Sequence, residues 1–143
     1  MSPEETARRS AESMWADDHA SQALGMTLEA VGPGSATVSM VLRDDMVNGH
    51  GIGHGGITFT LADSAFAFAC NSYNRSTVAA AAEIRFRRPT RLDDRLVATA
   101  TERSREGRDG VYDVLVTVGD EVVAVFVGRS KEIGGTLFPE EEP

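Results

Sequence analysis

The sequence predicts an α+β domain in which a curved antiparallel sheet wraps around one long central helix. The segment from Ile57 to Ser72 is apolar on nearly every side, and a helix of that composition belongs in the interior. The segments around it alternate apolar and polar residues with the period of two that half-buried strands show. A run of four such strands after the helix favours an antiparallel meander over a doubly wound parallel sheet.

The first part of the chain predicts a short helix and a hairpin. Ser2 can cap a helix and Pro3 suits its first turn, so we expect a helix over residues 3–17, within an N-terminal segment of residues 1–18. Two strands should follow, Met26–Val31 and Ser35–Leu42, around a Gly-Pro-Gly turn. After the loop 43–56 and the central helix, the other strands are expected at Thr77–Arg88, Arg95–Arg105, Val111–Gly119 and Glu121–Lys131.

Length and composition indicate a single globular domain over residues 1–143, with an acidic tail at 137–143 whose end, Pro139–Pro143, we expect to fray. The chain is 41% hydrophobic and 25% charged, and no apolar stretch reaches the length of about 20 residues that spans a membrane. The charged start is unlike a signal peptide, so we expect a cytoplasmic protein without a membrane partner. A net charge of −8 argues against a nucleic-acid partner, and Cys70 is expected to be a core residue.

Asp63 is the one carboxylate in the apolar helix. Burying a carboxylate is costly unless it is paired, and aspartate is a poor residue for the interior of a helix. Two interpretations remain open. Asp63 is either a catalytic base or nucleophile, or a structural carboxylate that a neighbouring helix end satisfies.

The glycine-rich loop before the helix holds further candidates. Gly55 lies where free backbone N–H groups and the helix dipole favour negative charge, which suits an oxyanion donor, although His54 and its two following glycines are also a tight helix entry. Asn48 is a candidate for orienting Asp63 or a water molecule, or for capping the loop. His50 and His54 are four residues apart, but the glycines between them disfavour a helix and no third ligand is evident. We therefore predict no metal site.

The run from Asn48 to Ser72, NGHGIGHGGITFTLADSAFAFACNS, resembles the central motif of the PaaI-type acyl-CoA thioesterases. The resemblance continues through Ile84–Pro89, Gly110–Asp113 and Gly128–Gly135, and thus covers nearly the whole chain. It implies the hotdog fold and the hydrolysis of an acyl-CoA thioester, with phenylacetyl-CoA or a hydroxylated relative as the expected substrate. The family is linked to phenylacetate catabolism and needs no cofactor, because CoA is part of the substrate.

The resemblance also implies an assembly and a site. Family members form dimers whose sheets join edge to edge, usually paired into tetramers, with active sites shared between subunits. Their catalytic positions match Asp63, Asn48 and Gly55 here, with His54 beside the glycine. One departure concerns Ala79 to Ala82, because several relatives carry a serine or threonine in that region that helps to position water.

Helix geometry independently favours a shared site. Eight residues separate Gly55 from Asp63, which is about 12 Å along a helix, whereas a reacting carbonyl has to lie about 3 Å from both groups. The simplest arrangement places Gly55 of one subunit opposite Asp63 of another. We therefore expect activity to require at least a dimer.

The substrate-binding residues are predicted from charge and apolarity. Arg85, Arg87, Arg88 and Arg91 form a basic cluster, and we expect Arg88 and Arg87, with Lys131 as a weaker candidate, to contact CoA phosphates. The alternative is a solvated strand face. Val47, Phe59 and Phe66 are the candidates for the acyl pocket.

Two other functions deserve comparison. A hotdog hydratase or dehydratase generally pairs the aspartate with a histidine further along the helix, and no histidine follows Asp63 there. A non-catalytic module that binds acyl-CoA would not need both Asp63 and the His-Gly-Gly loop. We therefore expect a thioesterase.

Overall fold

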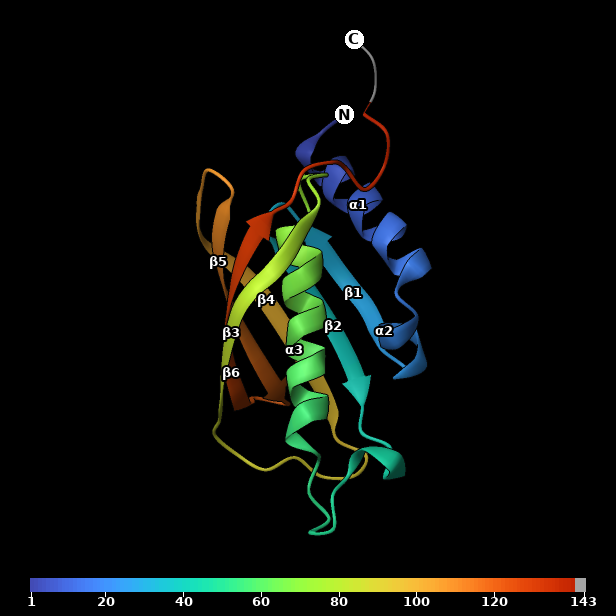
Figure 1. Ribbon diagram of the computed structural model, residues 1–143. Coiled ribbons are helices and arrows are strands. Elements are labelled where there is room, and N and C mark those ends of the chain that lie inside the picture. Colours follow the sequence, from blue (N-terminus) through green and yellow to red (C-terminus); the bar gives the residue numbers. More distant parts are fainter. Residues whose placement is uncertain (141–143) are drawn as a thin grey trace.

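The computed structural model describes residues 1–140, and it confirms the predicted architecture. A long helix, α3 (Gly55–Cys70), packs against the concave face of a six-stranded antiparallel sheet (Figure 1). The strands follow the spatial order β1-β2-β4-β5-β6-β3. Their bounds are β1 Thr27–Gly32, β2 Ser35–Val41, β3 Thr77–Phe86, β4 Arg95–Glu106, β5 Asp109–Val118 and β6 Glu121–Glu132.

The expected four-strand meander is wrong in one respect. Strands β4, β5 and β6 are consecutive neighbours, but β3 pairs with β6 at the far edge and not with β4. Figure 1 shows the connection after β3 passing beneath the lower end of α3 before β4 begins. After α3 the chain enters β3 on one side of the helix, whereas β4 pairs with β2 on the other side. The connection between β3 and β4 therefore crosses from one side of α3 to the other. Local patterns predict strands but not this crossing.

The core lies between α3 and the inner face of the sheet. Leu61, Ala62 and Ala65 are fully buried, and inward residues from the strands surround them. The Phe66 ring packs against the rings of Tyr112 and Phe126, with centroids 5.7 and 5.8 Å away. A side chain at Gly128 would lie within 2.7 Å of the Phe66 ring, so glycine allows the helix to approach the sheet there.

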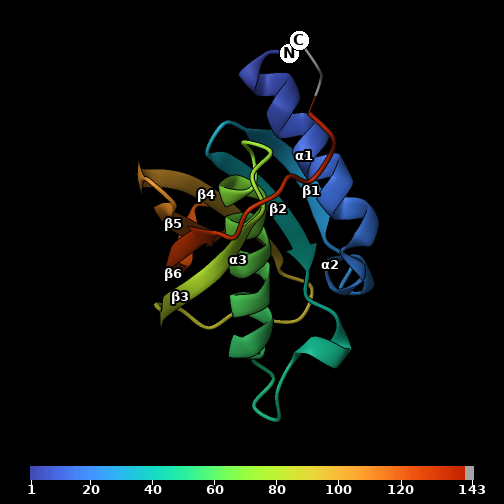
Figure 2. The same cartoon turned by 45° about the horizontal axis from the view of Figure 1, so that its top comes forward.

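An N-terminal arm lies beside β1 (Figure 2), and its Ala11 side chain belongs to the hydrophobic core. Helix α1 (Pro3–Asp17) begins as predicted, because the Ser2 hydroxyl accepts a hydrogen bond from the Glu5 amide. A second short helix, α2 (His19–Ala23), was not predicted. Five residues are too few for a periodic signal, and the turn depends on Asp18, whose side chain caps it.

The segment after β6 packs back onto α1 through Leu137 and Phe138, which come just before the residues expected to fray. The Asn74 side chain binds the backbone of Leu137 and Phe138, and the Ser13 hydroxyl donates to the Leu137 carbonyl at 2.7 Å. The Arg9 guanidinium lies over the Phe138 ring. The rest of the predicted tail, residues 141–143, lies outside the described residues.

Candidate functional site

The first turn of α3 leaves one backbone donor without a partner. His54 caps the helix, and its Nδ1 accepts a hydrogen bond from the Gly56 amide at 3.1 Å. The amides of Ile57 and Thr58 both donate to the His54 carbonyl. The Gly55 amide has no acceptor among residues 1–140, so it is the free donor at the positive end of this helix.

The preceding loop is held in place largely by its own backbone and by Asn48. The Asn48 side-chain oxygen accepts from the amides of His50 and Ile52, at 2.9 and 3.3 Å. The Gly53 amide donates to the Thr90 carbonyl, and a side chain at Gly53 would overlap the Thr90 hydroxyl. Asn48 therefore caps the loop with its oxygen, while its NH₂ group has no partner among the described residues and remains available to a ligand.

These groups line a cleft of about 350 Å³ between the start of α3 and the end of β3. Its walls combine backbone donors, two buried threonines, an aromatic ring and two arginines. The lining residues are Asn48, Ile52, Gly53, Gly55, Thr58, Phe86, Arg87, Arg88, Pro89, Thr90 and Val123. Two predicted catalytic positions, Asn48 and Gly55, are thus brought together with two predicted phosphate contacts, Arg87 and Arg88.

Asp63 does not line this cleft. It lies more than two helical turns beyond Gly55, half-buried, and no side chain among residues 1–140 hydrogen-bonds to it. Burial raises the pKa of the Asp63 carboxyl, and the negative charge of Asp18 raises it further. The carboxylate therefore has no side-chain partner among residues 1–140. It takes up a proton more readily than a surface aspartate does.

Two cleft residues were missed by sequence reasoning. Phe86 ends β3 with 56% of its surface exposed, and its ring lies 3.1 Å from the position that a Gly55 Cβ would take. Thr58 is buried on the helix, and its hydroxyl has no partner among the described residues. Its position could have been inferred from the sequence, because a threonine in the apolar first turn of a buried helix stands out as a polar residue near the cleft. Phe86 alternates with arginines like any inward strand residue, so its exposure could not be predicted from the sequence.

Several predicted binding residues lie elsewhere. Phe66 is a core residue, and the half-buried Phe59 packs against the Phe126 ring, 5.3 Å between centroids. Val47 pairs with Gly53 in the loop and does not line the cleft. Lys131 lies beside Asp109, eight residues along β6 from the cleft residue Val123, which is about 26 Å along a strand. Within one subunit, Lys131 is too distant to share this cleft.

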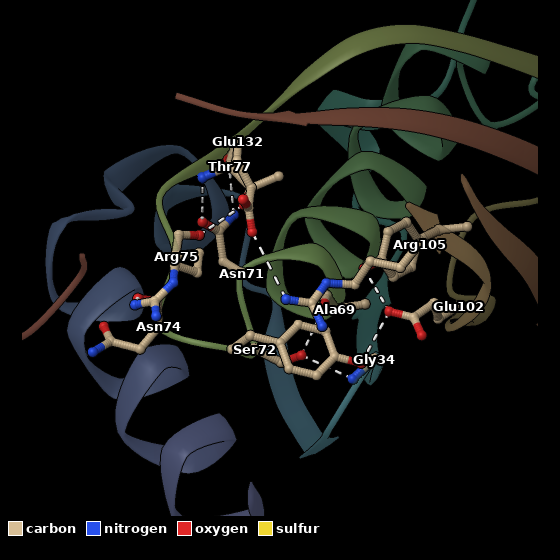
Figure 3. Close-up of polar contacts among 12 residues, drawn as sticks. Gly34, Ala69, Asn71, Ser72, Asn74, Arg75, Thr77, Glu102, Arg105 and Glu132 are labelled. Atoms are coloured by element: carbon tan, nitrogen blue, oxygen red, sulfur yellow. Dashed lines mark hydrogen bonds and ion pairs between the residues drawn. The ribbon is translucent and has the colours of Figure 1, made fainter. Parts of the chain in front are cut away.

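A second polar cluster surrounds the opposite end of α3 (Figure 3). The buried Asn71 side chain binds the Ala67 carbonyl and both backbone groups of Thr77, all within 3.0 Å. The hydroxyls of Tyr73 and Tyr112 both donate to Glu102. Because these groups are mutually paired, the cluster has the character of a structural cap.

The described residues contain no group of histidine, cysteine, aspartate and glutamate side chains arranged to hold a metal ion. The His54 Nδ1 atom is instead engaged in capping α3. Within residues 1–140, no helix combines the length and apolarity required to cross a membrane.

The model of the thioesterase superfamily matches residues 50–125, which include α3 with its N-cap and most of the sheet. The chain belongs to the thioesterase superfamily. It is 42% identical over 133 residues to the acyl-coenzyme A thioesterase PaaI of Escherichia coli, covering 92% of this chain and 95% of that protein.

Solved structures agree with this membership of the thioesterase superfamily. The E. coli PaaI protein from the phenylacetic acid degradation operon superposes with a TM-score of 0.93 at 41% identity, covering 94% of this chain and 99% of that one. A mutant of the phenylacetic acid degradation protein PaaI from Thermus thermophilus gives a TM-score of 0.79 at 34% identity, with 81% and 100% covered. The predicted hotdog fold and PaaI-type resemblance are therefore confirmed.

Proposed function

We propose that the protein hydrolyses an acyl-CoA thioester at a site formed by two subunits, with Asp63 of one and the Gly55 amide of the other. The observation that carries this proposal is the composition of the cleft. It contains a free helix-start donor and two arginines but no carboxylate among its lining residues. Hydrolysis needs both a donor for the developing oxyanion and a group that activates water or attacks the carbonyl.

The exposed edge of the sheet supports a dimer. Strand β3 has a neighbour on one side only, and its residues Val78 to Glu83 are all exposed. Edge strands normally carry protective features such as prolines, bulky charges or covering loops. Here the run from Ala79 to Ala82 carries no proline and no bulky or charged side chain, and a bulge between Ala79 and Ala81 is its one irregularity. A partner that pairs along β3 would place its α3 beside this one, and a pair of such dimers would give the tetramer that the resemblance implies.

The chemistry follows from the properties of these groups. Asp63, with its raised pKa, either accepts a proton from the attacking water or attacks the thioester carbonyl itself. The Gly55 amide stabilises the oxyanion as the carbon becomes tetrahedral. When Asp63 acts as a base, the C–S bond then breaks, the proton that Asp63 took from water passes to the thiolate, and the acyl group is released as the acid. When Asp63 is the nucleophile, C–S cleavage leaves a mixed anhydride on Asp63, which water hydrolyses to the acid while the CoA thiolate takes up the released proton. The NH₂ group of Asn48 orients the water or the thioester oxygen.

The arginines and the family suggest the substrate class. Arg87 and Arg88 lie at the mouth of the cleft, where they suit the phosphates of CoA. The related proteins named for phenylacetic acid degradation favour a phenylacetyl or hydroxyphenylacetyl group, and the exposed Phe86 ring offers it an aromatic contact. No cofactor beyond the substrate is required, and a cytoplasmic location remains a prediction.

A complementation experiment tests the shared site. Asp63→Asn removes the carboxylate, and Gly55→Pro removes the single N–H at a helix position where proline is well tolerated. The residue before it, His54, already has the extended backbone that precedes proline, with ψ of 130°. Each variant alone should hydrolyse phenylacetyl-CoA at least about 100-fold more slowly than the wild type.

Co-expression of the two variants, with a different tag on each, gives mixed dimers. Such a dimer contains one intact site of two, so about half of the wild-type activity should return. Gly55→Ala is the matched control, because it adds a side chain at the same place but keeps the N–H. Inactive mixed dimers would refute the shared site, and a wild-type protein that releases no thiol from any acyl-CoA would refute the activity.

A further inference from the structure

A chain of side-chain hydrogen bonds connects the N-terminal arm to the part of α3 that carries Asp63. Asp18 caps α2 with both oxygens, accepting from the Ser21 amide at 3.0 Å and from the Ser21 hydroxyl at 2.7 Å. The Ser21 and Ser64 hydroxyl oxygens are 2.8 Å apart. Because the single Ser21 hydroxyl proton is directed to Asp18, Ser64 has to be the donor to Ser21.

This chain is buried and specific. Ser21 and Ser64 are 2% and 8% exposed, so the hydroxyl bond between them is shielded from water. The Ser64 hydroxyl does not bond back to its own helix, as the Thr60 hydroxyl does with the Gly56 carbonyl. It spans the gap to α2 instead, and it does so from the residue next to Asp63.

The charged surroundings of Asp63 single out Asp18. After burial, the Asp18 carboxylate is the group that raises the pKa of Asp63. On the same helix, burial raises the pKa of the Cys70 thiol to about 12, so it is neutral. The strands packed on α3 present mainly apolar residues, and Tyr112 is bound to Glu102 near the far end of the helix. His19 of α2 is exposed.

We propose that Asp18, acting through Ser21 and Ser64, is a positioning residue that holds the Asp63 turn of α3 and keeps a second negative charge beside the catalytic carboxylate. This inference rests on the proposed function, in which Asp63 takes part in thioester hydrolysis. The fixed charge makes Asp63 a stronger base, and the buried hydroxyl pair keeps the charge at a constant separation. The N-terminal arm is then part of the catalytic apparatus, although it does not line the cleft.

The pH dependence of kcat/KM tests the role of the charge. Asp18→Asn keeps one side-chain oxygen for the Ser21 amide but removes the charge. The acidic limb of the profile should therefore move to lower pH, because the negative charge that raises the pKa of Asp63 is gone. The neighbouring Asp17→Asn is the matched control, because Asp17 is exposed and makes no hydrogen bond among the described side chains. If the acidic limbs of the kcat/KM profiles of Asp18→Asn and Asp17→Asn fall at the same pH, the proposal is overturned.

A titration without substrate separates this inference from the proposed function. The carboxyl carbon of Asp63 is followed by NMR in protein labelled with ¹³C-aspartate, with Asp63→Asn identifying its signal. The midpoint should be lower in Asp18→Asn than in the wild type and unchanged in Asp17→Asn. An unchanged midpoint in Asp18→Asn would overturn the positioning role even in an active enzyme. A wild-type protein that cleaves no acyl-CoA would instead overturn the proposed thioesterase function.

Discussion

The two ends of α3 are built in opposite ways. At the C-terminal end, Ser72 donates to the Ala69 carbonyl and accepts from the Gly34 amide, and Asn71 fastens the helix to the start of β3. At the N-terminal end, the Gly55 amide has no partner among residues 1–140 and faces a cleft. The fully paired end anchors the helix, and this anchoring allows the other end to keep an unsatisfied donor in a fixed place.

Asn48→Asp should strongly reduce catalysis at the open end. Aspartate keeps the oxygen that accepts from the His50 and Ile52 amides, so the loop and the unfolding temperature should change little. It loses the NH₂ group and adds a negative charge near the thioester. We expect kcat to fall about 100-fold. A normal kcat would exclude the Asn48 NH₂ group from the reaction.

Asn71→Ala should produce the complementary effect at the closed end. The substitution removes both partners of the Thr77 backbone and leaves buried polar groups unpaired. Unfolding free energy should fall by about 3 kcal/mol, measured by urea denaturation. The kcat of the molecules that remain folded should stay close to that of the wild type. A large loss of kcat in folded protein would contradict the separation of roles between the two ends.

Arg88→Gln should produce a smaller, binding-specific effect. Arg88 is exposed and lies 3.9 Å from Glu121, a loose surface pair that contributes little to stability. We expect KM for an acyl-CoA to rise about tenfold, with the difference shrinking at high salt, while kcat is preserved. Lys131→Gln, at the other end of β6, serves as the control. An equal rise in KM for both variants would show that the CoA phosphates reach beyond the cleft.

Asp63→Asn should increase stability while it removes activity. Because the folded-state pKa of Asp63 is raised, the folded protein binds its proton more tightly than the unfolded chain does. This stability is fully present below the ordinary pKa of aspartate and is lost as pH rises through the raised value. At pH 7 the variant should therefore unfold at a higher temperature than the wild type. The difference in unfolding temperature between Asp63→Asn and the wild type should shrink in acid. If the variant were less stable than the wild type at pH 7, the Asp63 carboxylate could not be unpaired.

The sequence was sufficient to predict α1, α3, the six strands and two polar groups of the cleft, the Asn48 side chain and the Gly55 amide, because each depends on local rules. The apolar run identified α3, the glycines marked its open start, and Asp63 was conspicuous as a lone charge. The position of β3 beside β6 depends on which side of the helix the chain leaves, which no local pattern specifies. Phe66 was predicted to line the acyl pocket but lies in the core. The sequence could not separate the two, because an aromatic residue on an apolar helix can face either a core or a ligand.

The contact between the two ends of the chain has a practical consequence. Phe138 packs under Arg9 and the Leu137 carbonyl binds Ser13, so the first and last elements meet at the pole opposite the loop before α3 (Figure 1). An affinity handle or a fluorescent fusion added at either end should project away from the cleft. The same proximity suits a circular permutant, in which a short linker joins the old ends and the new ends open at the exposed Gly107 turn between β4 and β5.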